Sequence, residues 1–279
     1  PLILSKLAST KQSTSSIQKC WIVWEWRGIF MIKNDEFIDG YTLFFKEFIN
    51  ETDSNVIFSR LWKFAEQSMK CVDEKNVKKS WKSLCDSIEN KDSNVFVRKY
   101  GRESQNNQRL LKEFYKFLFG ESFEVNIDKN NNDKPKKMLS EYTDYSVTKS
   151  EEKKILKNFQ TSHVFAKTKN CFAFTAPWNV VYLPKILDPF TGHEAKGEIK
   201  IKFERTLQKY FCKKYEVQIR EFNSKMKIYK NDLNSKREDL QKKLLAVDDN
   251  EAKVNKFIKE MEKQFAPIEI DGILEKEND

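Results

Sequence analysis

The sequence predicts an α+β protein with a mainly helical N-terminal region, a compact strand–loop–strand–helix segment and a helical C-terminal tail. Apolar residues recur at spacings of three and four through residues 35–118 and again through 213–265, which is typical of amphipathic helices. Residues 162–165 and 179–183 are two short β-prone runs, and Pro184 ends the second. We expect residues 166–178, which have neither period, to form a long loop between two strands.

The helical region is expected over residues 31–127. Its first apolar stripe is the widest and contains Phe37, Tyr41, Phe44, Phe45 and Phe48. Gly120 follows the last stripe and predicts a helix end there. Residues 128–137 contain Pro135 and no apolar period, so we expect residues 128–157 to form a solvated linker and basic segment between two domains.

The tail, residues 213–279, carries a seven-residue apolar repeat. Met226, Leu233, Leu240 and Val247 define it, and residues 248–250 interrupt the helix before apolar periodicity resumes. The pattern predicts either a helical hairpin packed on its own chain or a dimerising coiled coil. The short, imperfect repeat favours the hairpin.

Composition favours a polyanionic partner. The chain has 279 residues, a formal net charge of +9 and a pI of about 9.1, which indicate nucleic acid before an anionic membrane. Five cysteines with no C-x-x-C pair predict reduced thiols in a cytosolic protein and no structural zinc. No apolar run reaches 18 residues, so we expect no membrane span and a cytoplasmic location.

Residues 1–30 read as sequence from upstream of the natural start. Met31 opens an ordinary N-terminal stretch, and Arg27-Gly28 just before it permits a purine-rich coding like a bacterial ribosome-binding site. We therefore expect residues 1–30 to be non-native upstream or vector sequence. The alternative is a natural N-terminal arm.

The candidate chemistry rests on the two histidines of the chain. His163 lies at the first β-prone run and Asn179 opens the second. His193 starts a predicted helix, which follows a turn at residues 188–192 and has Thr191 as its candidate cap. Hydrolysis of a phosphodiester needs a base to take a proton from water, and a neutral imidazole does so near pH 7. It also needs positive charge on the phosphate oxygens, which a divalent cation supplies.

This arrangement resembles the HNH (ββα-metal) nuclease motif over about residues 158–200, within a nuclease segment that we expect at residues 158–212. The resemblance implies that His163 is the general base, that Asn179 braces the loop orienting it, and that His193 binds a metal ion. Lys196, three residues later, would contact phosphate. Ser162 stands where many family members have a second metal ligand, so Glu194 or Asp188 is the expected substitute. The implied cofactor is one divalent ion per site, Mg²⁺ or else Mn²⁺.

A second basic stretch is a weaker candidate for DNA contact. Arg98, Lys99 and Arg102 would bind phosphates, and Asn106 and Asn107 would read base edges. The alternative is a solvated turn before a helix.

The resemblance therefore implies an endonuclease that cuts double-stranded DNA, and by analogy a bacterial restriction or defence enzyme. Because one ββα site cuts one strand, a homodimer would suit cleavage of both strands. Two alternatives remain open. One is a non-catalytic, basic nucleic-acid-binding or scaffold protein, and the other is an RNA-cutting toxin with the same site.

Overall fold

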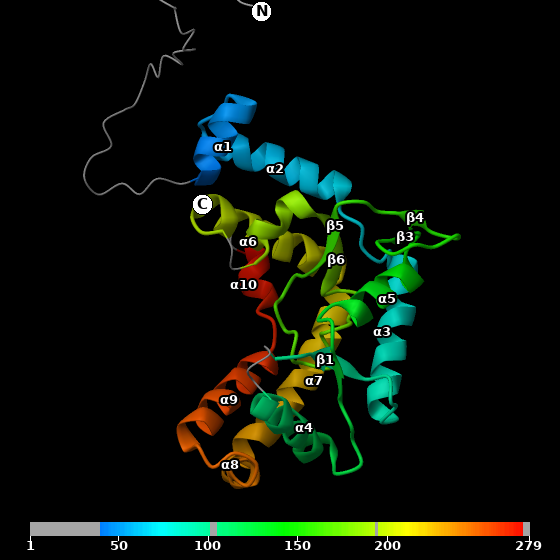
Figure 1. Ribbon diagram of the computed structural model, residues 1–279, viewed down its shortest axis with the longest axis vertical. Helices are drawn as coiled ribbons and strands as arrows, with labels where there is room; N and C mark the ends of the chain where they lie inside the picture. Colours follow the sequence, from blue (N-terminus) through cyan, green and yellow to red (C-terminus); the bar gives the residue numbers. More distant parts are fainter. Residues whose placement is uncertain (1–39, 101–104, 193–194, 276–279) are drawn as a thin grey trace, which may run out of the picture. The chain divides into compact units, whose positions relative to one another are not determined.

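The computed structural model describes residues 40–100, 105–192 and 195–275. Within it, Tyr41–Asp279 forms one compact unit. Helices dominate this unit and short strands join them, so the prediction of an α+β fold with mainly helical ends is confirmed (Figure 1). The predicted upstream segment, residues 1–30, lies outside the described residues.

The N-terminal region is helical, as predicted. It contains α1 (Gly40–Ile49), α2 (Ser54–Ser68), α3 (Glu74–Glu89) and α4 (Gln105–Phe119). Asp53 caps α2 by accepting a hydrogen bond from the Asn55 amide at 2.8 Å, and Asp73 caps α3 in the same way. Gly120 closes α4 at a φ of 93°, a left-handed conformation that favours glycine.

The first apolar stripe is buried on one side only. Phe45 is 8% exposed and packs against Phe190, whereas Phe48 is 73% exposed and contacts Phe44 with its ring tilted. A stripe of aromatic residues predicted the helix correctly, but in this unit only part of it reaches the core.

Within the described ranges, three two-stranded sheets connect the helices. β1 (Phe96–Arg98) pairs in parallel with β2 (Asn126–Asp128), and β3 (Tyr145–Ser146) pairs in parallel with β4 (Lys154–Ile155). β5 (Phe159–His163) runs antiparallel to β6 (Val180–Pro184). Every residue of β6 is buried, and Lys70 bridges its outer edge at Tyr182.

The expectation of a solvated linker at residues 128–137 was wrong. This stretch ends β2 and begins α5 (Asp133–Tyr142), which lies inside the compact unit. Pro135 sits in the first turn of α5, where a helix needs no backbone N–H. The buried Asp128 carboxylate accepts hydrogen bonds from the Asn130 and Lys134 amides at 3.1 and 2.8 Å. A polar sequence therefore forms a capped turn.

The C-terminal tail packs on its own chain. After the 3₁₀ helix η1 (Lys185–Phe190) come α6 (Glu198–Lys214), α7 (Glu216–Ser235), α8 (Arg237–Leu245), α9 (Glu251–Gln264) and α10 (Ile270–Glu275). α8 and α9 form a hairpin beside α4 (Figure 1). Met226, Leu233 and Leu240 are buried, so the hairpin alternative holds, with its predicted break after α8.

The described cysteines are thiols without disulfides. They are Cys71, Cys85, Cys171 and Cys212, while Cys20 lies outside the described residues. Burial raises the pKa of Cys85 and of Cys212 to about 12, so both are protonated at pH 7. No helix in the described ranges is long and apolar enough to cross a membrane.

Candidate active site at the end of strand β5

The candidate site lies where β5 ends and the connecting loop, residues 164–179, begins. His163 pairs with Val180 across the β5–β6 hairpin. Side chains alternate along a strand, so Thr161 and His163 share one face and Gln160 and Ser162 share the other. The 3.1 Å contact between Gln160 Nε2 and Ser162 Oγ is consistent with that alternation.

The connecting loop fixes the tautomer of His163. The ring lies parallel to Phe174, with centroids 5.4 Å apart, and Nε2 is 2.9 Å from the Phe174 carbonyl oxygen. Because a carbonyl oxygen only accepts hydrogen bonds, Nε2 carries the proton and Nδ1 keeps its lone pair. The Phe174 carbonyl thus orients the imidazole through Nε2, and the basic nitrogen Nδ1 lies on the other side of the ring.

His163 is neutral at pH 7. Its pKa is lowered to about 4, mainly by burial of the ring; the bond to the Phe174 carbonyl opposes this, and the positive charge of Arg98 adds a smaller lowering effect. A neutral histidine with a free lone pair can accept a proton from water.

Asn179 ties the two ends of the connecting loop together. Its side chain is fully buried; Oδ1 accepts from the Phe165 amide at 2.8 Å and Nδ2 donates to the Ala173 carbonyl at 2.9 Å. The first bond holds the residues just after His163, and the second holds the residue next to Phe174. Asn179 therefore joins the start of the connecting loop to its C-terminal half.

No local sequence pattern indicates the residues that hold the middle of this loop. Tyr115 of α4 and Asn170 of the loop are both fully buried and bond to main-chain groups of residues 169–172. Gln264, the last residue of α9, accepts from the Lys169 amide through Oε1 at 2.9 Å and from Asn170 Nδ2 through its carbonyl at 3.1 Å. Only the fold brings α4, α9 and the loop together.

Two lysines of the loop are buried without a carboxylate partner among the described residues. Lys167 Nζ donates to the Lys263 carbonyl at 2.9 Å, and Lys169 Nζ donates to the Arg98 and Lys99 carbonyls at 2.8 and 2.6 Å. Burial lowers the pKa of each lysine to about 8. A composition-based expectation places lysines at the surface, so these were missed.

The expected metal ligands are only partly described. His193 and Glu194 lie outside the described residues, and the described part of the chain has no cluster of three His, Cys, Asp or Glu side chains. Asp188, in η1, accepts a hydrogen bond from Gln160 Nε2, so its carboxylate lies on the Gln160–Ser162 face. Within the hairpin, Asp188 and His163 are therefore associated with opposite faces.

Lys196 is exposed just before α6, where a phosphate could reach it. Thr191, expected to cap that helix, instead donates through Oγ1 to the Asp188 carbonyl and ends η1. Gly197, at a φ of 94°, precedes α6. The 3₁₀ helix η1 takes up most of the predicted turn at residues 188–192, and α6 begins only at Glu198.

The second basic stretch is not a solvated turn. Arg98 and Lys99 are half-buried, and the Arg98 amide donates to the Thr168 carbonyl at 2.9 Å, which joins β1 to the connecting loop. Asn106 Nδ2 donates to Asp248 of the tail at 3.1 Å. Asn107 Oδ1 is buried and has no hydrogen-bond partner among the residues that the structure describes. Arg102 lies outside the described residues.

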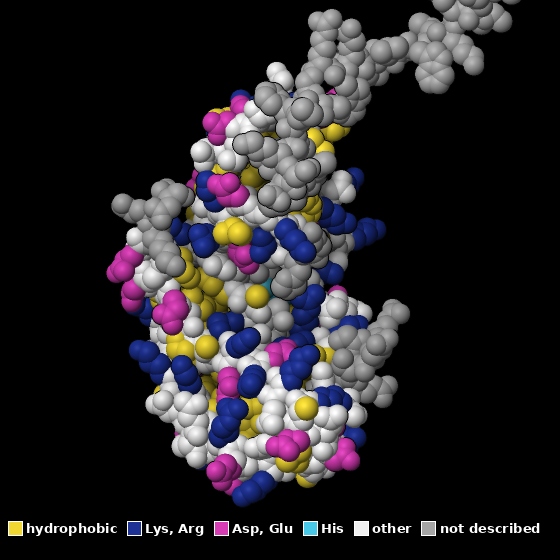
Figure 2. Space-filling model, turned by 90° about the vertical axis from the view of Figure 1, so that its left-hand side faces the viewer, with side chains coloured by type: hydrophobic (Ala, Val, Ile, Leu, Met, Phe, Trp, Pro, Cys, Tyr) yellow, Lys and Arg dark blue, Asp and Glu magenta, His cyan; other side chains and the backbone are white. Residues whose placement is uncertain are grey.

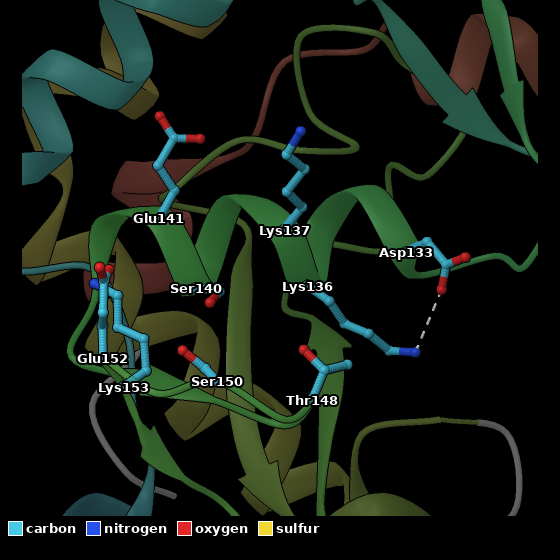
Figure 3. A pocket seen from close by; sticks show the side chains of 9 residues that line it. All are labelled: Asp133, Lys136, Lys137, Ser140, Glu141, Thr148, Ser150, Glu152 and Lys153. Atoms are coloured by element: carbon cyan, nitrogen blue, oxygen red, sulfur yellow. Dashed lines mark ion pairs between the residues drawn. The ribbon is translucent and has the colours of Figure 1, made fainter.

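The surface has mixed charge. Figure 2 shows Lys and Arg side chains across the middle of one face, with Asp and Glu side chains among them. An open groove of about 610 Å³ lies between α5 and residues 148–153 (Figure 3). Its lining contains three lysines, three carboxylates and three hydroxyl groups, which favours no ligand charge: Asp133, Lys136, Lys137, Ser140, Glu141, Thr148, Ser150, Glu152 and Lys153.

Comparison with known proteins gives one family. A family model described as "Uncharacterised protein PM1201" matches residues 72–270. The protein of that name from Pasteurella multocida (strain Pm70) is 38% identical over 197 residues, which cover 71% of this chain and 83% of the relative. No solved structure matches. The matched span contains the β5–β6 hairpin, the connecting loop and all three positions of the HNH-like pattern.

Proposed function

We propose that this chain, a member of the PM1201 family, is a metal-dependent endonuclease of the HNH type that hydrolyses double-stranded DNA. The proposal is based on the geometry at the end of β5. The observation that carries the proposal is the pairing of a neutral His163, fixed as the Nε2–H tautomer, with an Asn179 that braces both ends of its loop. The order strand, loop, strand and helix from β5 to α6 supports it.

In this mechanism His163 Nδ1 takes the proton from the attacking water. The Phe174 carbonyl holds the opposite nitrogen, which stabilises the protonated ring as the charge develops. Arg98, whose strand β1 is joined to the connecting loop at the Thr168 carbonyl, and the exposed Lys196 offer positive charge to the phosphate oxygens.

Metal binding falls to His193 and Glu194. The Asp188 carboxylate is engaged by Gln160 on the Ser162 face, so we assign it to holding the hairpin. An imidazole and a carboxylate suit Mg²⁺ or Mn²⁺ when water completes the shell. When bound, the divalent ion supplies positive charge to the leaving 3′ oxygen.

The test is cleavage of supercoiled plasmid with Mg²⁺, with Mn²⁺ and with chelator. We expect the unmodified chain to cut only with metal and His163→Gln to be inactive while still binding DNA. Glutamine keeps an N–H for the Phe174 carbonyl but has no basic nitrogen, so it separates the base from the structural contact. Metal-dependent cutting by His163→Gln at the normal rate would refute the assignment.

Assays with different nucleic-acid substrates distinguish the proposed function from its two alternatives. Salt-sensitive DNA binding without cutting would identify a non-catalytic binding protein. Cutting of structured RNA but not of plasmid would identify an RNA-cutting toxin. If the chain acts as a homodimer, linear plasmid should form together with nicked circles, because two sites then reach both strands.

Asp188→Asn is the matched control for the metal assignment. Asparagine keeps an oxygen to accept from Gln160, so we expect near-normal cleavage, within about threefold. His193→Ala should lose metal-dependent cleavage. A loss of cleavage in Asp188→Asn as large as in His193→Ala would make Asp188 a ligand instead.

A further inference from the structure

The turn that presents the Phe174 carbonyl to His163 is held by a single tyrosine hydroxyl from α4. Tyr115 is fully buried, and its hydroxyl donates to the Lys169 carbonyl at 2.7 Å and accepts from the Cys171 amide at 2.9 Å. These two bonds use the donor and an acceptor site of one oxygen. The Tyr115 hydroxyl therefore holds the first residues of the turn, Lys169 and Cys171.

Asn170, between those two residues, fixes the rest of the turn. Its Oδ1 accepts from the Phe172 amide at 2.8 Å, and its backbone carbonyl accepts from the Phe174 amide at 2.9 Å. Its Nδ2 donates to the Gln264 carbonyl at the end of α9 at 3.1 Å. The bond from the Phe174 amide fixes the peptide unit between Ala173 and Phe174, which directly precedes the Phe174 carbonyl.

We propose that Tyr115 and Asn170 are positioning residues for His163, acting through the Phe174 carbonyl that holds the imidazole N–H. In this role α4 and α9 contribute to the active site without touching substrate. The inference deepens the proposed nuclease function and rests on it for the activity readout, but the effect on the imidazole is measurable without activity.

The physical basis is the precision that a general base requires. A base misplaced by about 1 Å by a change remote from the reaction can lose about a hundredfold in rate. Supporting hydrogen bonds hold the base in its productive geometry. Loss of the Tyr115 hydroxyl frees two main-chain groups at the start of the turn, and the Phe174 carbonyl moves with them.

The experiment compares Tyr115→Phe with the matched control Tyr215→Phe. Tyr215 is also fully buried, and its hydroxyl donates to the Val72 carbonyl, outside the connecting loop. Each change removes one hydroxyl and keeps the aromatic ring. In Tyr115→Phe we expect kcat for plasmid cleavage to fall about 10- to 100-fold with KM within about twofold. In Tyr215→Phe we expect both constants to be unchanged.

The second readout is the imidazole N–H resonance of His163 in ¹⁵N-labelled full-length protein. It should be slow to exchange in the unmodified chain and in Tyr215→Phe, and lost or strongly shifted in Tyr115→Phe. A folded Tyr115→Phe with an unchanged resonance and unchanged kcat overturns the proposal. A KM effect alone also overturns it, because it indicates a role in binding DNA.

Asn170→Ser provides an independent variant if Tyr115→Phe does not fold. We expect the same change at His163, since serine cannot span from the Phe172 amide to the Gln264 carbonyl. If neither variant folds while Tyr215→Phe does, the role is structural and the proposal is overturned. If the unmodified chain does not cleave DNA, the nuclease function fails, and the imidazole resonance still decides the positioning role.

Discussion

The connecting loop and helix α1 differ in opposite ways: the loop is irregular but buried, whereas α1 is regular but largely exposed. The loop, residues 164–179, has no regular secondary structure, yet most of it is buried and side chains satisfy its main-chain groups. Helix α1 is regular, yet Leu43, Phe44 and Phe48 are exposed. Burial and satisfied main-chain groups, and not regularity of the backbone, therefore distinguish the loop from helix α1.

The largest expected effect on the free energy of unfolding is that of Asn179→Ala in the connecting loop. It leaves the Phe165 amide and the Ala173 carbonyl unpaired in a fully buried place, which should lower the free energy of unfolding by about 3–4 kcal/mol. Urea unfolding measures it. A cost below about 1 kcal/mol would mean that the loop does not depend on this brace.

His163 makes the stability of the loop sensitive to acid. Its pKa falls from about 6.5 unfolded to about 4 folded, so the unfolded chain binds the proton more tightly. The free energy of unfolding should therefore drop as pH falls from 6.5 to 4, by at most about 3 kcal/mol. The difference between the unmodified chain and His163→Gln isolates this contribution, and equal slopes for the two proteins would contradict it.

Lys167 and Lys169 should make the loop more stable in mild alkali. Burial lowers their pKa values to about 8 from 10.5, so the folded chain releases these protons first. The contribution of the two lysines to stability should then rise between pH 7 and pH 9, by roughly 2 kcal/mol for the pair. The buried thiols of Cys85 and Cys212, whose pKa values are raised, oppose it as pH approaches 9, and the buried tyrosines oppose it above about pH 10. The difference in pH dependence between the unmodified chain and Lys167→Met isolates the contribution of Lys167 and tests its sign.

The smallest effect is expected in α1. Phe48→Ala removes a ring that is 73% exposed, so the free energy of unfolding should change by less than about 0.5 kcal/mol. Phe45→Ala, three residues earlier on the buried side, is the matched control and should cost about 3 kcal/mol. A large cost at Phe48 would show that α1 packs against something else.

Local sequence patterns predicted the elements of the site but not the contacts that complete it. The β-prone runs located β5 and β6 to within three residues, and His163 and Asn179 fell at the strand end and the strand start. The brace at Asn179 followed from the HNH resemblance. Tyr115 and Gln264 lie 48 residues before and 101 residues after His163, as their numbering gives, so no local pattern relates them to it.

The remaining errors have local causes. The expected linker is instead the start of α5, because the buried Asp128 carboxylate bonds to the main chain before the helix and Pro135 is tolerated in its first turn. The 3₁₀ helix η1 displaced the expected cap at Thr191. Each depends on which main-chain groups are buried, and that is decided by tertiary packing and not by composition.

The most direct test of the central claim is an NMR titration of the His163 imidazole, made in His193→Asn so that one histidine remains. The account predicts a proton on Nε2 alone at pH 7, an unprotonated Nδ1, and a pKa of about 4. Two protonated nitrogens at pH 6, or free exchange between tautomers, would contradict it. The loop would then not hold a neutral base.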